Sequence, residues 1–189
     1  MHRLNRIAIL GFCTALLGVP HLRAQTKDIV ELYGGVDFTN ISPEPMVPKQ
    51  NLTGFVVGAA PYATSWFGAA LEISKQYGTV GSSAGSFANA NLHESSYLAG
   101  PNFRFLNLPR LNLAFRALLG GVQGQVFLPG SQESQTRFAL NLGLGVDVGI
   151  TRMLAFRIEP GWYRTSFSQE NQNSLRISFG PVLRLGRRE

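Results

Sequence analysis

Apolar residues alternate with polar or small residues from Arg137 to Ile150, with a period of two. The apolar positions are Phe138, Leu140, Leu142, Leu144, Val146, Val148 and Ile150. The positions between them are Arg137, Ala139, Asn141, Gly143, Gly145, Asp147 and Gly149. Because successive side chains of a strand point to opposite faces, this segment is predicted to be a β-strand with one apolar face. At about 3.3 Å per residue and a tilt of about 40°, it rises about 33 Å, which is enough to cross the apolar band of an outer-membrane barrel, about 25 Å tall.

A lone strand cannot cross a bilayer, because its edge groups would have no hydrogen-bond partners in hydrocarbon. Further strands are therefore required, and seven other segments alternate in a similar way. They are Asp28–Asn40, Leu52–Pro61, Trp66–Tyr77, Ser95–Phe105, Leu111–Gln125, Leu154–Ser168 and Ser174–Gly186. Short connections at Tyr62–Ser65, Leu106–Arg110 and Thr151–Met153 alternate with long ones at Ile41–Asn51, Gly78–Asn91 and Val126–Gln135, and the last connection, Gln169–Asn173, is intermediate. The pattern predicts an all-β chain folded as an eight-stranded antiparallel up-and-down transmembrane β-barrel.

The first 24 residues resemble a secretory signal peptide. His2, Arg3 and Arg6 form a basic start, an apolar run follows from Ile7 to Val19, and Ala24 is a small residue at the expected cleavage site. The run is too short for a transmembrane helix. We therefore expect residues 1–24 to direct export across the inner membrane and residues 25–189 to form one outer-membrane barrel domain. The only cysteine lies in the leader, so the mature chain has no thiol chemistry.

The charges indicate which face of the strands is inside. An arginine that faces lipid at the middle of the bilayer destabilises a barrel by about 2 to 4 kcal/mol. The charged face of each strand must therefore be in the barrel interior. The predicted interior charge network consists of Glu31, Asp37, Glu72, Arg104, Arg116, Asp147, Arg157, Glu159, Arg176 and Arg184. Without Arg3, Arg6 and Arg23 of the leader, the formal charge falls from +6 to +3. The remaining basic residues are spread among the strands, so nucleic acid is not an expected partner.

Three segments resemble the OmpA-like outer-membrane β-barrel family: LGLGVDVGITRMLAFR, GPNFRF and LRISFGPVLRLG. The similarity covers essentially the whole mature chain. It implies an eight-stranded transmembrane barrel with a plugged, hydrogen-bonded interior, in which Asp147 and Arg157 match the family's G-x-D and following Arg positions. The implied partners are outer-membrane lipid, the barrel-assembly machinery during insertion, and an unidentified extracellular partner that contacts the loops.

Two features of the chain depart from the family pattern. Gly186-Arg187-Arg188-Glu189 stands where such barrels carry a terminal aromatic residue, and we expect no peptidoglycan-binding domain to follow. We therefore expect membrane insertion to rely on Leu183 and Leu185. We do not expect a role in anchoring the cell wall.

Alternative functions depend on a few residues. His93 and Ser95 resemble the His/Ser pair of lipid A deacylases, but no third member of a triad is evident, and we interpret His93 as a loop residue. His93 is too isolated for a metal site, and Gly143 and Gly145 lie mid-strand with no helix after them, so neither a metal nor a cofactor is expected. We predict a structural or surface-interaction role without catalysis. A narrow porin-like channel, a lipid-modifying hydrolase and a soluble lipocalin-like binder are the alternatives.

Overall fold

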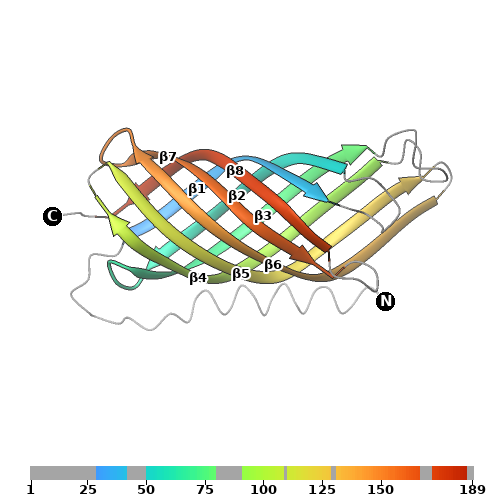
Figure 1. Cartoon of the computed structure of the whole chain (residues 1–189), viewed down its shortest axis with the longest axis horizontal. Helices are drawn as coiled ribbons and strands as arrows, with labels where there is room; N and C mark the ends of the chain where they lie inside the picture. The colour runs from blue at the N-terminus through green and yellow to red at the C-terminus, as the bar shows by residue number, and fades with distance from the viewer. Residues whose placement is uncertain are drawn as a thin grey trace.

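The chain forms a closed antiparallel barrel of eight strands in a computed structural model (Figure 1). The structure describes residues 29–41, 50–79, 91–108, 110–128, 131–166 and 172–186. The strands are β1 (Ile29–Ile41), β2 (Gln50–Tyr62), β3 (Phe67–Thr79), β4 (Asn91–Asn107), β5 (Leu111–Leu128), β6 (Ser131–Gly149), β7 (Leu154–Thr165) and β8 (Gln172–Leu185). Each strand pairs with its sequence neighbour, and β8 pairs with β1 to close the barrel. The predicted fold class is therefore confirmed.

The connections define two ends of the barrel. At the short-turn end, segments 63–66, 108–110 and 150–153 join consecutive strands. At the loop end, the connecting segments are 42–49, 80–90, 129–130 and 166–171. The expected signal peptide, residues 1–24, lies outside the described residues. Within the described ranges, no helix has the length and apolar character needed to cross a bilayer.

Two predicted boundaries at the loop end were wrong. β4 begins at Asn91 and not at Ser95, so His93 lies in a strand and not in a loop. The predicted loop Val126–Gln135 is largely strand, because β5 and β6 stay paired as far as Leu128 and Ser131. Consecutive residues in these stretches are of one kind, polar at His93 and Glu94 and from Ser131 to Thr136, and apolar from Val126 to Leu128. The alternation therefore disappears while the backbone ladder continues. The other ends agree within three residues.

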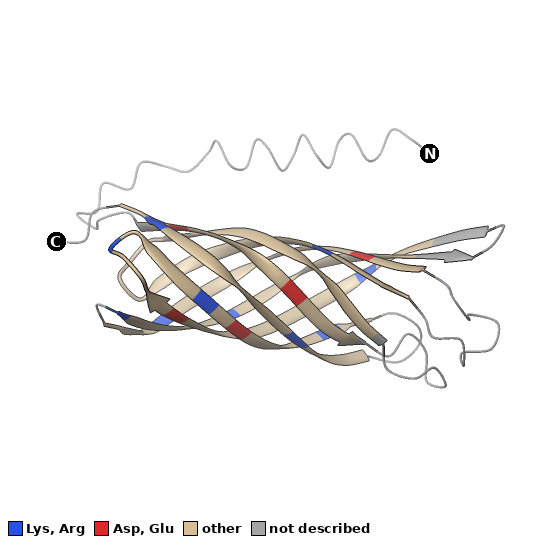
Figure 2. Cartoon of the chain, turned by 90° about the horizontal axis from the view of Figure 1, so that it is seen from above, with Lys and Arg blue, Asp and Glu red and all other residues tan. Residues whose placement is uncertain are grey.

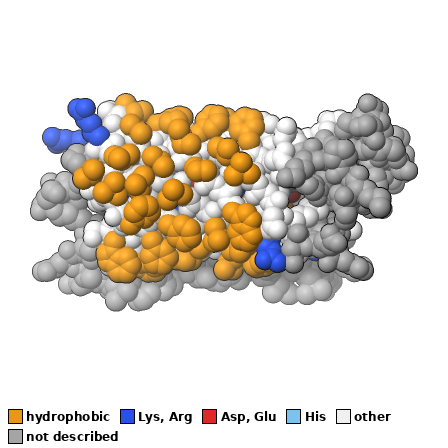
Figure 3. Space-filling model, in the orientation of Figure 1, with side chains coloured by type: hydrophobic (Ala, Val, Ile, Leu, Met, Phe, Trp, Pro, Cys, Tyr) orange, Lys and Arg blue, Asp and Glu red, His pale blue; other side chains and the backbone are white. Residues whose placement is uncertain are grey.

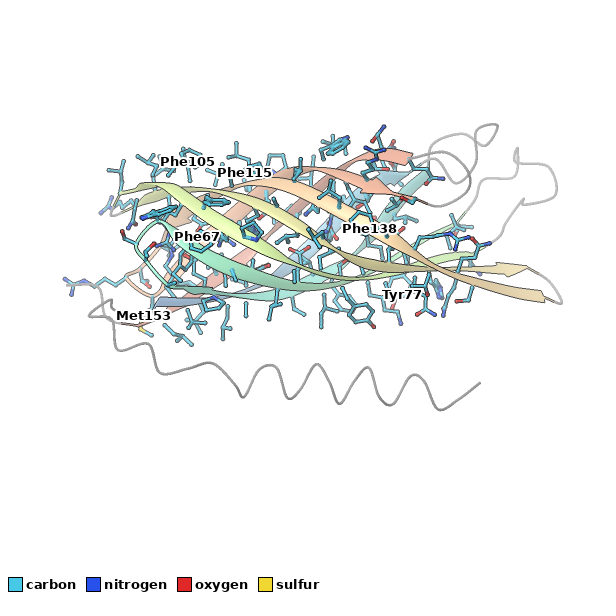
Figure 4. All side chains as sticks on the ribbon, turned by 90° about the horizontal axis from the view of Figure 1, so that it is seen from below. Phe67, Tyr77, Phe105, Phe115, Phe138 and Met153 are labelled. Atoms are coloured by element: carbon cyan, nitrogen blue, oxygen red, sulfur yellow. The ribbon has the colours of Figure 1, made fainter. Side chains whose placement is uncertain are left out.

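The apolar positions of the strands face the outside of the barrel, as predicted. Figure 3 shows hydrophobic side chains covering the central band of one face of the barrel, and Figure 4 shows Phe105, Phe115 and Phe138 projecting away from the wall. Ile73, at the centre of β3, is 49% exposed, whereas its neighbours Glu72 and Ser74 are buried in the interior. The barrel therefore has an apolar outer surface and a polar core.

Four prolines divide the barrel wall into hairpins. Pairing is continuous within β1–β2, β3–β4, β5–β6 and β7–β8. The other four interfaces each skip two residue pairs, and each gap contains one proline: Pro61, Pro101, Pro160 or Pro181. Proline has no N–H to donate, so it is tolerated inside a strand where the ladder is interrupted. The chain thus closes as four uninterrupted hairpins joined at four interrupted seams.

The seam between β1 and β8 also brings two backbones unusually close. A Cβ atom on Gly35 would collide with the carbonyl oxygen of Phe179, and one on Gly180 would collide with that of Gly34. Only glycine allows this approach, which lets a small barrel bend sharply enough to close.

Candidate functional site

The barrel interior is the candidate site, because it gathers charged side chains from every strand except β2. The structure places all ten members of the predicted charge network inside, and none is more than 4% exposed. Figure 2 shows acidic and basic positions interspersed along the strands of the barrel. The ten residues are Glu31, Asp37, Glu72, Arg104, Arg116, Asp147, Arg157, Glu159, Arg176 and Arg184.

Near the short-turn end, two carboxylates hold three guanidinium groups in what we term the Glu31 cluster. Glu31 accepts hydrogen bonds from Arg104 Nη2 at 2.7 Å and Arg157 Nη2 at 2.8 Å, and its Oε1 lies 3.3 Å from Arg184 Nε. Asp147 accepts from Arg157 Nε at 2.5 Å and from Arg184 Nη2 at 2.8 Å. The cluster has a formal charge of +1.

Nearer the loop end, two arginines hold three carboxylates in the Arg176 cluster. Arg176 Nη2 and Nε donate to Asp37 at 2.7 and 2.9 Å, and its Nη1 lies 2.8 Å from Glu72 Oε1. Arg116 Nη1 lies 3.6 Å from Glu72 Oε2, and its Nη2 pairs with Glu159. This cluster has a formal charge of −1. The ten side chains therefore neutralise one another only when both clusters are taken together.

Tyr33 joins the two clusters across the lumen. The centre of its ring lies 4.4 Å from Arg116 Cζ and 5.2 Å from Arg157 Cζ, so it receives one guanidinium from each cluster. Its hydroxyl donates to Glu72 Oε2 at 3.3 Å. A cation over an aromatic face is attracted by the ring quadrupole, most strongly where water is excluded. Tyr33 thus links the clusters chemically while filling the space between them.

The sequence interpretation missed one interior carboxylate, Glu94. Its side chain is 7% exposed and accepts a hydrogen bond from Tyr163 Oη at 2.9 Å. It faces Gln76 across the β3–β4 ladder, and Gln76 Nε2 in turn donates to Asp37 at 2.5 Å. Extending the inward parity of β4 back from Leu98 would have identified Glu94. The signal was obscured because the Gly/Ser/Asn-rich segment before it was interpreted as a loop.

His93 and Ser95 occupy outward-facing positions of β4. The His93 ring packs edge-on against Tyr77 with 4.9 Å between ring centres. Glu94, the carboxylate between them in sequence, is buried on the opposite face. A triad needs an acid that orients the base from the same side. The six carboxylate side chains that the structure describes all point into the barrel, so none of these six orients His93 from its own face of β4.

In the part of the chain with described side chains, no group of three or more His, Cys, Asp or Glu residues is arranged to hold a metal ion. Instead, each cluster pairs its carboxylates with guanidinium groups. The chemistry that the interior supports is mutual charge compensation.

No protein-family model matches the chain, and no curated protein matches it in sequence. Solved structures do match its fold. Ail, the attachment invasion locus protein of Yersinia pestis, is 16% identical over 85% of this chain and 100% of its own, with a TM-score of 0.61. Neisserial surface protein A is 16% identical over 82% and 96%, with a TM-score of 0.58. OprG of Pseudomonas aeruginosa is 12% identical over 86% and 98%, with a TM-score of 0.58. The chain therefore has the fold of eight-stranded outer-membrane β-barrels.

Proposed function

We propose that this chain is a small outer-membrane β-barrel protein with a plugged lumen and a structural or surface-interaction role. In this proposal residues 1–24 are removed as a signal peptide, and residues 25–189 are inserted with the help of the barrel-assembly machinery. The protein carries no catalytic activity of its own.

The observation that carries the membrane location is the inverted distribution of polarity. Leu119 on the outer surface is 53% exposed, whereas Glu31 in the interior is fully buried. A soluble protein rarely exposes a large continuous apolar surface, and it rarely buries so many charges. In a lipid bilayer the same distribution is favourable, because the apolar face meets hydrocarbon and the charges compensate one another inside. A soluble lipocalin-like binder would need the opposite arrangement.

The plug is supported by ion pairs that reach across the lumen from strand to strand. Glu31 on β1 contacts arginines on β4, β7 and β8. Arg116 on β5 contacts Glu72 on β3 and Glu159 on β7. Bulky side chains such as Arg116, Tyr163 and Leu118 are fully buried between these contacts. Eight strands enclose a space that side chains can fill, so a network of this density leaves little room for a water-filled path.

The proposed surface role rests on the loop-end connections and on the fold neighbours. One structure of Ail, with a TM-score of 0.61, was determined in complex with the heparin analogue sucrose octasulfate, and another neighbour is named a surface protein. In such a barrel the connections at one end face the cell exterior, where variable loops contact partners. In this proposal the connecting segments 42–49, 80–90 and 166–171 contact the extracellular partner.

Heat modifiability tests the membrane barrel. The full chain is expressed in a Gram-negative host, extracted from outer membranes in mild detergent, and compared with and without boiling on a denaturing gel. We expect the unboiled protein to migrate differently, because a closed barrel resists the detergent until heated. N-terminal sequencing of the same material should begin at Gln25. A protein that is soluble in the periplasm and shows no mobility shift would contradict the proposal.

Planar-bilayer recordings test the plug. We expect no discrete conductance steps from the unaltered protein, and steps from Arg157→Ala, which removes a guanidinium that bridges Glu31 and Asp147. The matched control is Arg152→Ala, which removes an exposed arginine from a turn at the rim. Regular conductance steps from the unaltered protein would contradict the plugged lumen and would show that the barrel is a narrow channel.

A further inference from the structure

At the loop end, the β5–β6 hairpin extends past the ends of β7 and β8 (Figure 1). β6 stays paired with β5 as far as Ser131, but its pairing with β7 begins only at Ala139. A single backbone hydrogen bond, from Ser166 N to Phe138 O at 3.2 Å, adjoins that pairing. No described strand pairs with the side of β6 that faces away from β5 between Ser131 and Arg137. We term this segment the β6 edge.

The backbone of the β6 edge offers hydrogen-bond donors and acceptors to a further strand. In an antiparallel ladder the N–H and C=O of one residue point to the same side, and successive residues alternate between the two sides. Because Phe138 O points toward β7, the backbone groups of Thr136, Ser134 and Gln132 point the same way. Thr136 O accepts a hydrogen bond of 3.4 Å from Arg137 Nη1. The N–H of an added strand would replace this long contact and release the guanidinium.

The sequence of the β6 edge does not prevent pairing. Natural sheet edges are often protected by proline, a bulge or lysine side chains. Residues 131–137, SQESQTR, contain no proline, glycine or lysine, and their register with β5 runs without a bulge. The side chains from Ser134 to Arg137 are all exposed, although Gln135 and Arg137 occupy positions that face the interior lower in the same strand, as Ala139 does. The edge therefore stands clear of the described barrel wall.

The charges of the β6 edge indicate which partner it fits. Arg137 is exposed, and it donates to Gln135 Oε1 at 3.2 Å. The six carboxylates with described side chains are buried in the interior, so none of these six compensates its charge. Glu133 precedes Arg137 by four residues in β6. On an antiparallel partner strand, the residue opposite Arg137 therefore comes four positions before the one opposite Glu133. An acidic residue followed four positions later by a basic one complements this edge.

We infer that the β6 edge binds an extended segment of another protein, which adds as an antiparallel strand beyond the end of β7 and carries an acidic residue opposite Arg137. The inference rests on the proposed outer-membrane location, which places the loop end outside the cell. In such strand addition, main-chain hydrogen bonds supply affinity and the alternating side chains supply selectivity. Every strand pair of the barrel is antiparallel, so an added strand in this orientation continues the existing pattern.

Peptide binding to the protein extracted from outer membranes tests the charge pattern. The probe is a fluorescent seven-residue peptide of Val and Thr with Glu at its second position and Lys at its sixth, which match Arg137 and Glu133. We expect a saturable rise in anisotropy. Arg137→Glu should weaken the affinity by about tenfold or more, since it replaces attraction with repulsion. The matched control Arg152→Glu, in the exposed turn before β7, should leave the affinity unchanged. A peptide with Glu and Lys exchanged should bind more weakly.

Two further variants test the backbone contacts and the register. Thr136→Pro removes an N–H that points to the open side and leaves the ladder with β5 intact, because proline is tolerated on edge strands. It should bind the probe about tenfold or more weakly than Thr136→Val, which keeps the N–H. The only cysteine of the chain is in the expected leader, so Gln135→Cys supplies a unique thiol. It should form a disulfide with a cysteine at the fourth position of the peptide in preference to the fifth, because directly opposite residues are close enough.

The inference would be overturned by the absence of saturable binding, or by equal affinities within the pair Arg137→Glu and Arg152→Glu or the pair Thr136→Pro and Thr136→Val. Concentration-dependent dimers, measured by light scattering and abolished by Thr136→Pro, would assign the edge to a second copy of this chain instead. Heat modifiability of each sample separates the two proposals. A heat-modifiable barrel that binds no peptide contradicts only the role of the β6 edge, whereas the lack of a heat-modifiable barrel contradicts the proposed function.

Discussion

The two faces of the barrel wall follow different chemical rules although the same strands supply both. On the outer face each side chain needs only to be apolar, because lipid is a solvent without directional demands. On the inner face each charge needs a particular partner, as Glu31 does with three arginines from three strands. The outer face is thus specified by residue class and the inner face by individual pairings. Substitutions on the two faces should therefore change the free energy of unfolding by different amounts and for different reasons.

The largest effect should come from removing the carboxylate at the centre of the Glu31 cluster. Glu31→Gln keeps the shape of the side chain but leaves three buried guanidinium groups with Asp147 as their only acid in the cluster. We expect the free energy of unfolding to fall by about 3 to 5 kcal/mol, since stranded buried charges are costly. Urea unfolding of the detergent-folded barrel, followed by gel mobility, measures it. A loss below about 1 kcal/mol would show that the pairs are not coupled.

A charge placed on the outer face should have the next largest effect. Ile73→Arg puts a guanidinium at the middle of β3, where the cost should be about 2 to 4 kcal/mol if the face meets hydrocarbon. Trp66→Arg, in the exposed turn before β3, should cost about 0 to 1 kcal/mol because it lies near the interface. The measurement is the free energy of unfolding in lipid vesicles. Equal costs at the two depths would argue against a lipid-facing surface.

Two adjacent glycines of β5 should differ in their tolerance of a methyl group. A Cβ on Gly120 would collide with the carbonyl oxygen of Tyr97, whereas the nearest atom to a Cβ on Gly121 is Arg137 O at 4.0 Å. Gly120→Ala should therefore cost about 1 to 3 kcal/mol, as overpacking usually does. Gly121→Ala should be neutral or slightly stabilising. The urea concentrations at which the two variants are half unfolded test this prediction. A lower midpoint for Gly121→Ala than for Gly120→Ala would contradict the close backbone contact at Gly120.

The smallest effect should come from Glu94→Gln, although this side chain is also buried. Its hydrogen bond comes from the neutral hydroxyl of Tyr163 and not from a guanidinium. Replacing the carboxylate with an amide therefore strands no cation, and the free energy of unfolding should change by no more than about 1 kcal/mol. A loss as large as that of Glu31→Gln would mean that Glu94 is an integral member of the charge network.

The sequence interpretation was most accurate where the two faces of a strand differ most in polarity. Where one face meets lipid, the alternation is strong, and it correctly predicted eight strands and the orientation of Glu31, Arg116 and Arg176. Beyond the apolar band the contrast fades. The end of β5, which is apolar throughout, and the beginning of β6, which is polar throughout, were interpreted as a loop for this reason, and Glu94 was missed at the start of β4.

The pattern of apolar and polar residues was sufficient to predict the strand number and the closed antiparallel fold, because a bilayer imposes the same alternation on every strand. It could not establish which charges meet. Glu31 on β1 and Arg157 on β7 lie 126 residues apart in the sequence, and only β8 separates their strands in the barrel wall. Their 2.8 Å contact depends on the stagger between strands once the barrel is closed. The same closure divides the charges into two clusters of opposite sign, since a partner across the lumen is defined by three-dimensional position and not by sequence spacing.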